Sequence, residues 1–157
     1  MLDAKKVILT LADNTTNTIT DSSRLSTEED YSAAIYSKED LIINGNGTLN
    51  VNAGYRNGIK STDDCIIVSG TLNITSTEDG IIGKDLCGIV AGDININAGS
   101  DGVKSTYDTD TTKGNVIIEG GNITIKASND GIQAENILVI NDGTINIKTN
   151  NGAADTT

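Results

Sequence analysis

Short runs that alternate branched aliphatic with polar residues, separated by glycines, recur along most of the chain. A glycine followed by a branched residue stands at Gly58-Ile59, Gly80-Ile81, Gly102-Val103 and Gly131-Ile132, with Ala34-Ile35 in the same phase. The repeat interval lies between 21 and 29 residues along the series that ends at Gly152. A period in the low twenties with short aliphatic runs predicts a solenoid of stacked β-coils.

The second half of each repeat contains the clearest alternation of apolar and polar residues. Because successive side chains of a strand point to opposite faces, the apolar members are predicted to stack inside and the polar members to face solvent. The predicted interior pairs are Leu49/Val51, Leu72/Ile74, Ile94/Ile96, Ile123/Ile125 and Ile145/Ile147, with a further ladder of Ile35, Ile59, Ile81, Val103 and Ile132. We therefore predict an all-β fold, a single-stranded parallel β-helix of about five coils with three short strands each.

Two segments depart from the period. Residues 1–33 contain a strand pattern at 7–11 but no regular repeat, so we expect an N-terminal cap and entry strand followed by coils over 34–157. The interruption of the pattern at Gly152 suggests that a further coil follows in the full-length protein. The fourth coil carries an insertion of about seven residues, placed within 107–113. Such an insertion is either a binding loop or a neutral surface loop.

Composition narrows the classes of function. The chain has no His, Phe, Trp or Pro, and its net charge is −11. The absence of His excludes a Ser-His-Asp triad and a histidine metal site. An acidic surface argues against a nucleic-acid partner, because phosphate binding needs a basic face. No apolar run reaches the length of a membrane span.

Several of these runs together resemble a bacterial family. They are the entry segment at 7–13 and 17–21, the run at 31–41, Asn57-Gly58-Ile59-Lys60-Ser61, and Asp130-Gly131-Ile132-Gln133-Ala134-Glu135. This ordered series is similar to the carbohydrate-binding-domain proteins of clostridial and other Gram-positive surfaces, over nearly the whole chain. The resemblance implies a right-handed parallel β-helix shaped like a pectate lyase, calcium binding, and affinity for cellulose and polygalacturonate without established catalysis. It also implies an extracellular or cell-surface location. The chain departs from the family at Ile82 and Ile137, which leaves the acidic row incomplete.

Carboxylates form two rows when the coils are aligned. One row precedes the glycine steps, and the other opens the following strand, where Glu39/Asp40, Asp63/Asp64 and Asp85 align. Equivalent side chains of neighbouring coils lie ~4.8 Å apart, so ionised carboxylates there repel unless a cation such as Ca²⁺ bridges them. The alternative is that these residues only form turns beside glycine. The predicted Ca²⁺ ligands are Asp63, Asp64, Asp79, Asp85, Asp101, Asp108 and Asp130.

Polysaccharide contacts are predicted at the few aromatic and cationic residues near the turns. They are Tyr55, Arg56, Lys60, Lys104 and Tyr107. An acidic protein binds a polyuronate only if an ion bridges the two like charges, whereas a neutral glucan fits the outward Asn/Thr face. Arg56 is also the one plausible base for a calcium-dependent lyase, although a solvated surface arginine is the simpler interpretation.

Cys65 and Cys87 lie one repeat apart and both point inward in this alignment. Parallel side chains in register do not offer good disulfide torsions, so an inert pair of thiols is favoured over a bridge. The prediction for the whole chain is a monomeric, non-catalytic, calcium-binding module for plant cell-wall polysaccharide. The alternatives are a structural adhesin coil without a small ligand, an ice-binding surface, or a pectate-lyase-like enzyme.

Overall fold

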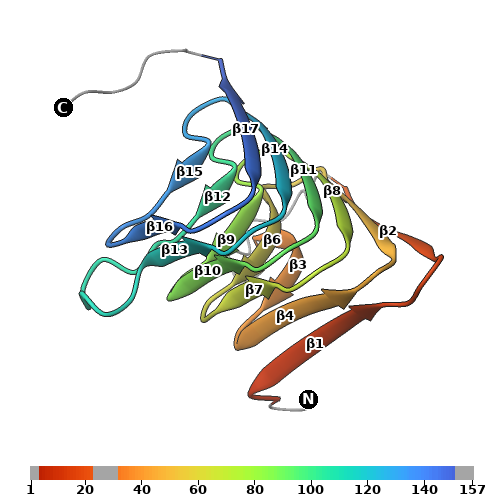
Figure 1. Cartoon of the computed structure of the whole chain (residues 1–157), viewed down its shortest axis with the longest axis horizontal. Helices are drawn as coiled ribbons and strands as arrows, with labels where there is room; N and C mark the ends of the chain where they lie inside the picture. Colours follow the sequence, from red (N-terminus) through yellow and green to blue (C-terminus); the bar gives the residue numbers. More distant parts are fainter. Residues whose placement is uncertain (1–3, 23–31, 151–157) are drawn as a thin grey trace.

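The computed structural model describes residues 4–22 and 32–150. All regular elements in this part of the chain are strands. They form three sheets of parallel strands, and the coils stack along one axis (Figure 1). The chain visits the sheets in turn, so that every third strand belongs to the same sheet. This is the predicted parallel β-helix. Among the described residues, no helix is long and apolar enough to cross a membrane.

The strands group as follows. Sheet A contains β1 (Lys6–Leu11), β4 (Asp40–Gly45), β7 (Cys65–Ile67), β10 (Leu86–Ile89), β13 (Asn115–Ile118) and β16 (Leu138–Ile140). Sheet B contains β2 (Thr16–Asp21), β5 (Thr48–Ala53), β8 (Thr71–Ser76), β11 (Asp93–Ala98), β14 (Asn122–Ala127) and β17 (Thr144–Thr149). Sheet C contains β3 (Ala33–Ser37), β6 (Asn57–Ser61), β9 (Ile81–Gly83), β12 (Val103–Lys104) and β15 (Ile132–Gln133).

The core consists of aliphatic ladders in register. In sheet B, Leu72 pairs with Ile94, which pairs in turn with Ile123, and all three are fully buried. Ile59, Ile81 and Val103 form the equivalent ladder of sheet C. Each predicted interior position of the central coils is therefore confirmed. The ladders become exposed at the C-terminal end of the described solenoid, where Leu138, Ile140 and Ile147 are 46%, 50% and 46% accessible.

Glycine is required at the start of the sheet C strands because neighbouring atoms leave no room for a side chain. A Cβ on Gly80 would lie 2.5 Å from the Ile96 methyl Cγ2 and 2.5 Å from the carbonyl oxygen of Gly102. The same two kinds of clash recur at Gly58 and Gly102, and none of these glycines has a positive φ. Close approach of sheet C to the core and to the next coil, rather than a special backbone angle, excludes a side chain.

The N-terminal segment contains the predicted entry strand and a second strand, and both join the sheets. Strand β1 pairs in parallel with β4 from Lys6 to Leu11, and β2 pairs with β5 from Thr16 to Asp21. Both strands therefore occupy regular positions in sheets A and B, and these sheets have six strands rather than about five. The segment covers the first coil by continuing the solenoid. The rest of the predicted cap, residues 23–31, lies outside the described residues together with 1–3.

Candidate functional site

Carboxylates converge at the corner where sheet C turns into sheet A. Asp40 begins β4, and Asp64 immediately precedes β7; the pairing of Leu41 with Cys65 places these two aspartates side by side. One carboxylate oxygen from each of Asp40, Asp63 and Asp64 lies within 4.8 Å of the other two. Ser61 holds this turn, because its Oγ donates to the carbonyl of Glu39 (2.8 Å) and accepts from the amide of Asp63 (3.1 Å).

The next coil extends this acidic cluster. Asp85 follows Asp63 in the stack, and its amide donates to the carbonyl of Asp63 at 3.3 Å. Asp85 is 8% exposed as a whole residue, and its side chain forms an ion pair with Lys113 from the inserted loop. At the other end, Lys6 lies 3.4 Å from Asp40. The row of carboxylates is thus flanked by one lysine on each side.

Crowding changes the protonation of the central carboxyls. Burial, a hydrogen bond with Asp85 and the negative charge of Asp85 raise the pKa of Asp63. Burial and repulsion by Asp40 and Asp85 also raise the pKa of Asp64, although Lys113 and Lys6 oppose the shift. The donor set contains only carboxylate oxygens, the ligands that hard divalent cations prefer. The residues present therefore fit Ca²⁺, which would relieve the same repulsion.

The inserted loop at 107–113, part of the connection from β12 to β13, lies beside the acidic corner and protrudes ahead of β13 in Figure 1. Its Tyr107 donates a backbone hydrogen bond to the carbonyl of Lys84 (3.0 Å). The ring lies close to two ammonium groups, with Lys84 Nζ at 4.7 Å and Lys113 Nζ at 4.9 Å from the centroid. A depression of about 360 Å³ opens here, and Asp63, Asp64, Asp85 and Lys113 contribute to its wall.

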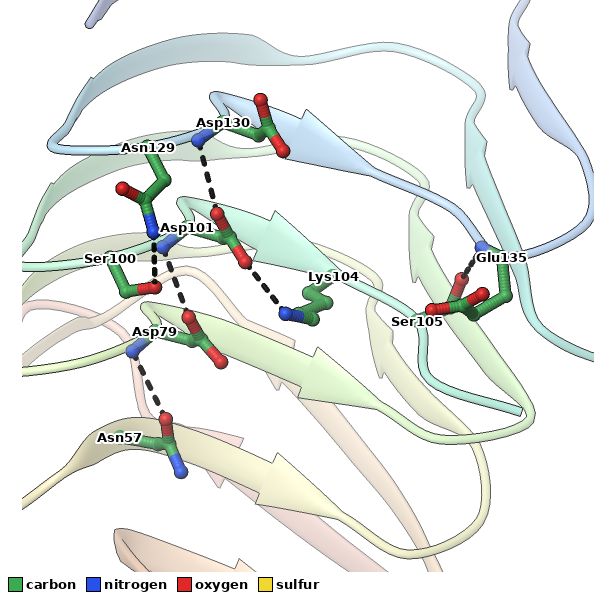
Figure 2. Close-up of polar contacts among 9 residues, drawn as sticks. All are labelled: Asn57, Asp79, Ser100, Asp101, Lys104, Ser105, Asn129, Asp130 and Glu135. Carbon is green, nitrogen blue, oxygen red and sulfur yellow. Dashed lines mark hydrogen bonds and ion pairs between the residues drawn. The ribbon is translucent and has the colours of Figure 1, made fainter. Parts of the chain in front are cut away.

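The second predicted row of carboxylates forms a ladder at the start of the sheet C strands (Figure 2). The amides of Asp79, Asp101 and Asp130 each donate a 3.0 Å hydrogen bond to the side-chain oxygen one coil earlier, on Asn57, Asp79 and Asp101 respectively. Because every step joins a side chain to the backbone of the next coil, the row holds neighbouring coils in register. Asn129 and Ser100 add a parallel contact of 3.1 Å.

Lys104 neutralises part of this ladder. Its Nζ lies 2.7 Å from the second carboxylate oxygen of Asp101, which is 3% exposed. Burial disfavours the charge of Lys104, but the hydrogen bond to Asp101 and the charges of Asp79, Asp101 and Glu135 together raise its pKa. Lys104, one of the predicted polysaccharide contacts, therefore forms its ion pair within the protein.

Tyr55 and Arg56 lie at the corner between sheets B and C, and Lys60 lies within β6. Arg56 has a φ of 56°, its Nε is 3.9 Å from Glu78, and its guanidinium is 5.4 Å from the Tyr55 ring centroid. Lys60 Nζ donates a hydrogen bond to Ser32 Oγ at 3.1 Å. Burial and the positive charge of Arg56 lower the pKa of Lys60, although the negative charges of Asp79 and Glu78 oppose the shift. The length of β6, about 16 Å of extended chain, separates Arg56 from the acidic cluster.

The predicted cation ligands therefore fall into separate groups. Asp63, Asp64 and Asp85 gather at the corner between sheets C and A, together with Asp40, which sequence reasoning placed in the same row without selecting it. Asp79, Asp101 and Asp130 form the ladder, and Asp108 is exposed in the inserted loop. The signal for Asp40 was its position directly before Leu41, which matches that of Asp64 before Cys65.

Two other features lie outside these acidic rows. Cys65 and Cys87 are adjacent in register, free and fully buried, and burial raises the pKa of Cys87 to about 12. The predicted pair of free, inward-facing thiols is thus confirmed, and its low reactivity stays a prediction. On the outer face of sheet B, Asn73 donates to Asn50 (2.9 Å) and Asn95 donates to Asn73 (3.1 Å), which gives a flat ladder of amides.

Comparison with known proteins agrees with this architecture. A family model described as carbohydrate-binding domain-containing protein matches residues 1–157. The chain belongs to this carbohydrate-binding domain family. A carbohydrate-binding domain-containing protein of Acetivibrio thermocellus is 39% identical over 75 residues, which are 45% of this chain and 26% of the relative.

A solved structure provides the counterpart in three dimensions. It is described as a polysaccharide lyase-like protein from C. thermocellum, in a gadolinium derivative, and is 33% identical with a TM-score of 0.76. The match covers 92% of this chain and 63% of that chain. This carbohydrate-binding domain therefore spans about a quarter of the curated relative and less than two thirds of the similar structure.

Proposed function

We propose that this domain binds acidic plant cell-wall polysaccharide of the polygalacturonate type without cleaving it, through Ca²⁺ held by Asp40, Asp63 and Asp64. The observation that carries the proposal is the convergence of their oxygens within 4.8 Å, beside a depression of about 360 Å³. The similar solved protein is described as a gadolinium derivative, and gadolinium, like calcium, is a hard cation with oxygen ligands. Membership of the carbohydrate-binding domain family supports the same class of ligand.

The surroundings of the cluster suit an anionic polymer that arrives with an ion. Ca²⁺ takes 6–8 oxygen ligands, so three carboxylates leave coordination for oxygens of the polymer. In the absence of the ion, a chain of net charge −11 repels a polyuronate. Lys113 supplies a cation at the wall of the depression, and its hydrogen bond with Asp85 keeps that cation charged by raising its pKa. The predicted ligand roles of Asp79, Asp85, Asp101, Asp108 and Asp130 remain predictions.

The arrangement favours binding over catalysis. Arg56, the proposed alternative base, is at the other end of β6 and engages Glu78 and Tyr55 rather than the acidic depression. A base must reach the proton that it removes, within hydrogen-bond distance or through one water. We therefore propose a monomeric module that acts outside the cell or at its surface and positions other parts of a longer protein on the polymer.

A second candidate ligand is a neutral glucan such as cellulose, on the outer face of sheet B. The amide ladder of Asn50, Asn73 and Asn95 gives a flat array of polar groups with the strand spacing of the solenoid. Binding there needs no cation. The two candidates are therefore distinguished by their dependence on calcium.

Isothermal titration with polygalacturonate in calcium and in chelator tests the main proposal. We expect binding in calcium only, and we expect Asp64→Asn to weaken it at least tenfold. Asp142→Asn removes the same charge from an exposed turn and should bind like the unchanged protein. Equal loss in both variants, or binding that persists in chelator, would contradict the calcium site.

Further assays separate the remaining alternatives. Pull-down with insoluble cellulose in chelator tests the outer face of sheet B, where Asn73→Leu should abolish retention. Release of unsaturated products from polygalacturonate, lost in Arg56→Ala, would support a lyase instead. Failure of the folded domain to bind any plant polymer would support the structural adhesin.

A further inference from the structure

The outer face of sheet A carries a row of aliphatic side chains. The register places Ile42, Ile66, Gly88 and Ile117 in one line across β4, β7, β10 and β13. The isoleucines of this line are only partly buried, because they point away from the core. The outer face of sheet B, by contrast, is lined with Asn and Thr. Sheet A therefore has an apolar stripe on its solvent side.

Gly88 interrupts the stripe without a structural reason. Its φ is not positive, and the atoms nearest to an added Cβ would be Ile66 Cγ1 and Cγ2 at 3.5 and 3.7 Å, which is ordinary contact. The other sheet positions with Gly, such as Gly58 and Gly83, have clashes at 2.5 Å or less. Glycine weakens a strand interior and often marks a place where a ligand approaches the backbone closely.

The missing side chain leaves a notch in the stripe. Its volume is about 220 Å³, and Ile66 and Ile117 stand on either side of Gly88, with Leu86 and Val90 along the same strand. Val90 is 44% exposed although it is a large aliphatic residue. Glu119 also lines the notch, and apart from it the lining is aliphatic.

The notch adjoins the acidic depression. Leu86 and Ile117 line both hollows. Leu86 also occupies the position in β10 that corresponds to Asp64 beside β7, because Cys87 pairs with Cys65. Gly88 lies two residues further, about 6.6 Å along the strand. A substituent on a ligand held at the carboxylates can thus reach the notch.

The position of the notch restricts its occupant. Strand β10 is paired on both sides, with β7 and β13, so no free strand edge is available there for a peptide to extend the sheet. The neighbouring carboxylates require a ligand that is mostly oxygen-rich and arrives with a cation. A small apolar group attached to such a polymer satisfies both conditions. We propose that the Gly88 notch is a subsite for a methyl-bearing ester group on the polyuronate bound at the acidic cluster.

This inference rests on the proposed function and adds a substituent to its ligand. The methyl group has two sources, a methyl ester on the uronate carboxyl or an O-acetyl ester on a hydroxyl. The test compares unesterified, methyl-esterified and O-acetylated polygalacturonate by isothermal titration in calcium. Gly88→Val fills the notch and continues the aliphatic row. Gly88→Ala is a milder filling variant, and Thr10→Val adds an apolar side chain to the same face at β1, away from the notch.

We expect Gly88→Val to bind unesterified polymer like the unchanged protein. We expect it to bind one of the two esters about fourfold more weakly than the unchanged protein binds that ester, because about fourfold in affinity is the effect of burying one methyl group. Thr10→Val should leave all three affinities unchanged. The ester that responds identifies the source of the methyl group. Equal affinities of Gly88→Val and the unchanged protein for both esters would overturn the subsite. Absence of calcium-dependent binding to the unesterified polymer, in protein that melts normally, would instead overturn the proposed function and this inference with it.

Discussion

The backbone amide of Asp101 donates a 3.0 Å hydrogen bond to the carboxylate of Asp79 in the preceding coil. The same bond recurs between Asp130 and Asp101, and at the first step the acceptor is Asn57. The ladder therefore needs a side-chain oxygen at each level and not a charge. Because Asp101 is buried, its bonds contribute to the stability of the solenoid as well as to its register.

Replacement of Asp101 separates these two contributions. Asp101→Asn keeps an oxygen for the amide of Asp130 and loses only the charge that pairs with Lys104. Asp101→Ala removes both and leaves a backbone donor without its partner, so we expect it to lower the free energy of unfolding by about 1.5–3 kcal/mol. Urea unfolding measures the difference. Equal stability of the two variants would show that the acceptor oxygen does not hold the coils together.

The aliphatic ladder predicts that the stability of the protein depends strongly on the polarity of the side chain at position 96. Ile96 is 3% exposed. Ile96→Asp should abolish cooperative unfolding, because an unpaired buried charge costs several kcal/mol. Ile96→Val should cost only about 0.5–1.5 kcal/mol. The matched control is Ile8→Asp, at a position that is 58% exposed. Thermal unfolding followed by circular dichroism provides the comparison, and similar melting of Ile96→Asp and Ile8→Asp would refute the assignment of Ile96 to the core.

The acidic cluster predicts how calcium and pH act together. Asp63 and Asp64 have pKa values raised above the ordinary 3.8 in the folded protein, so folding opposes their ionisation. Below about pH 3.8 both are protonated in either state and contribute no penalty. As the pH rises through the raised pKa values, the cluster lowers the stability of the metal-free protein. Ca²⁺ binds the ionised form, so its stabilisation should grow over the same pH window.

Differential scanning calorimetry with calcium or chelator tests this coupling. The rise in melting temperature caused by calcium should be small near pH 4 and larger near pH 7. Saturation at about 100 times the dissociation constant corresponds to about 2.7 kcal/mol. Magnesium at equal ionic strength is the control for screening of surface charge. A calcium effect that magnesium reproduces, or that does not change with pH, would count against the site.

The paired thiols predict low reactivity. Cys65 and Cys87 are fully buried, and burial raises the pKa of both, that of Cys87 to about 12. Since the thiolate is the nucleophile, neither residue should react with a thiol reagent at about pH 8 in the native state. Both should react after unfolding in guanidinium. Rapid labelling of the native protein would show that the coils containing β7 and β10 open readily.

Periodicity alone determined most of the fold. The ladder of Leu72, Ile94 and Ile123 was predicted because alternation assigns a face to each residue and the repeat assigns its partner. Alternation is a local property of each strand, and the repeat is regular along the chain, so both can be read from the sequence. The thiol pair followed from the same register. The glycine steps were located correctly, but their cause, close approach of Gly80 to Ile96 and to the next coil, is a packing relationship that no single repeat contains.

Only the tertiary structure decided which polar residues act together. The two acidic rows look alike in sequence. In one row the carboxylates accept hydrogen bonds from backbone amides, as Asp79 does from Asp101. In the other row the carboxylates of Asp40, Asp63 and Asp64 lie close together. The difference arises because side-chain direction at a turn depends on how the corner is folded, here by Ser61. The N-terminal strands joined the sheets although they lack the repeat, since backbone pairing depends on shape and not on a glycine pattern. The contact of Lys113 with Asp85 likewise forms only when the inserted loop folds back against the preceding coil. The sequence of the loop by itself does not predict this long-range contact.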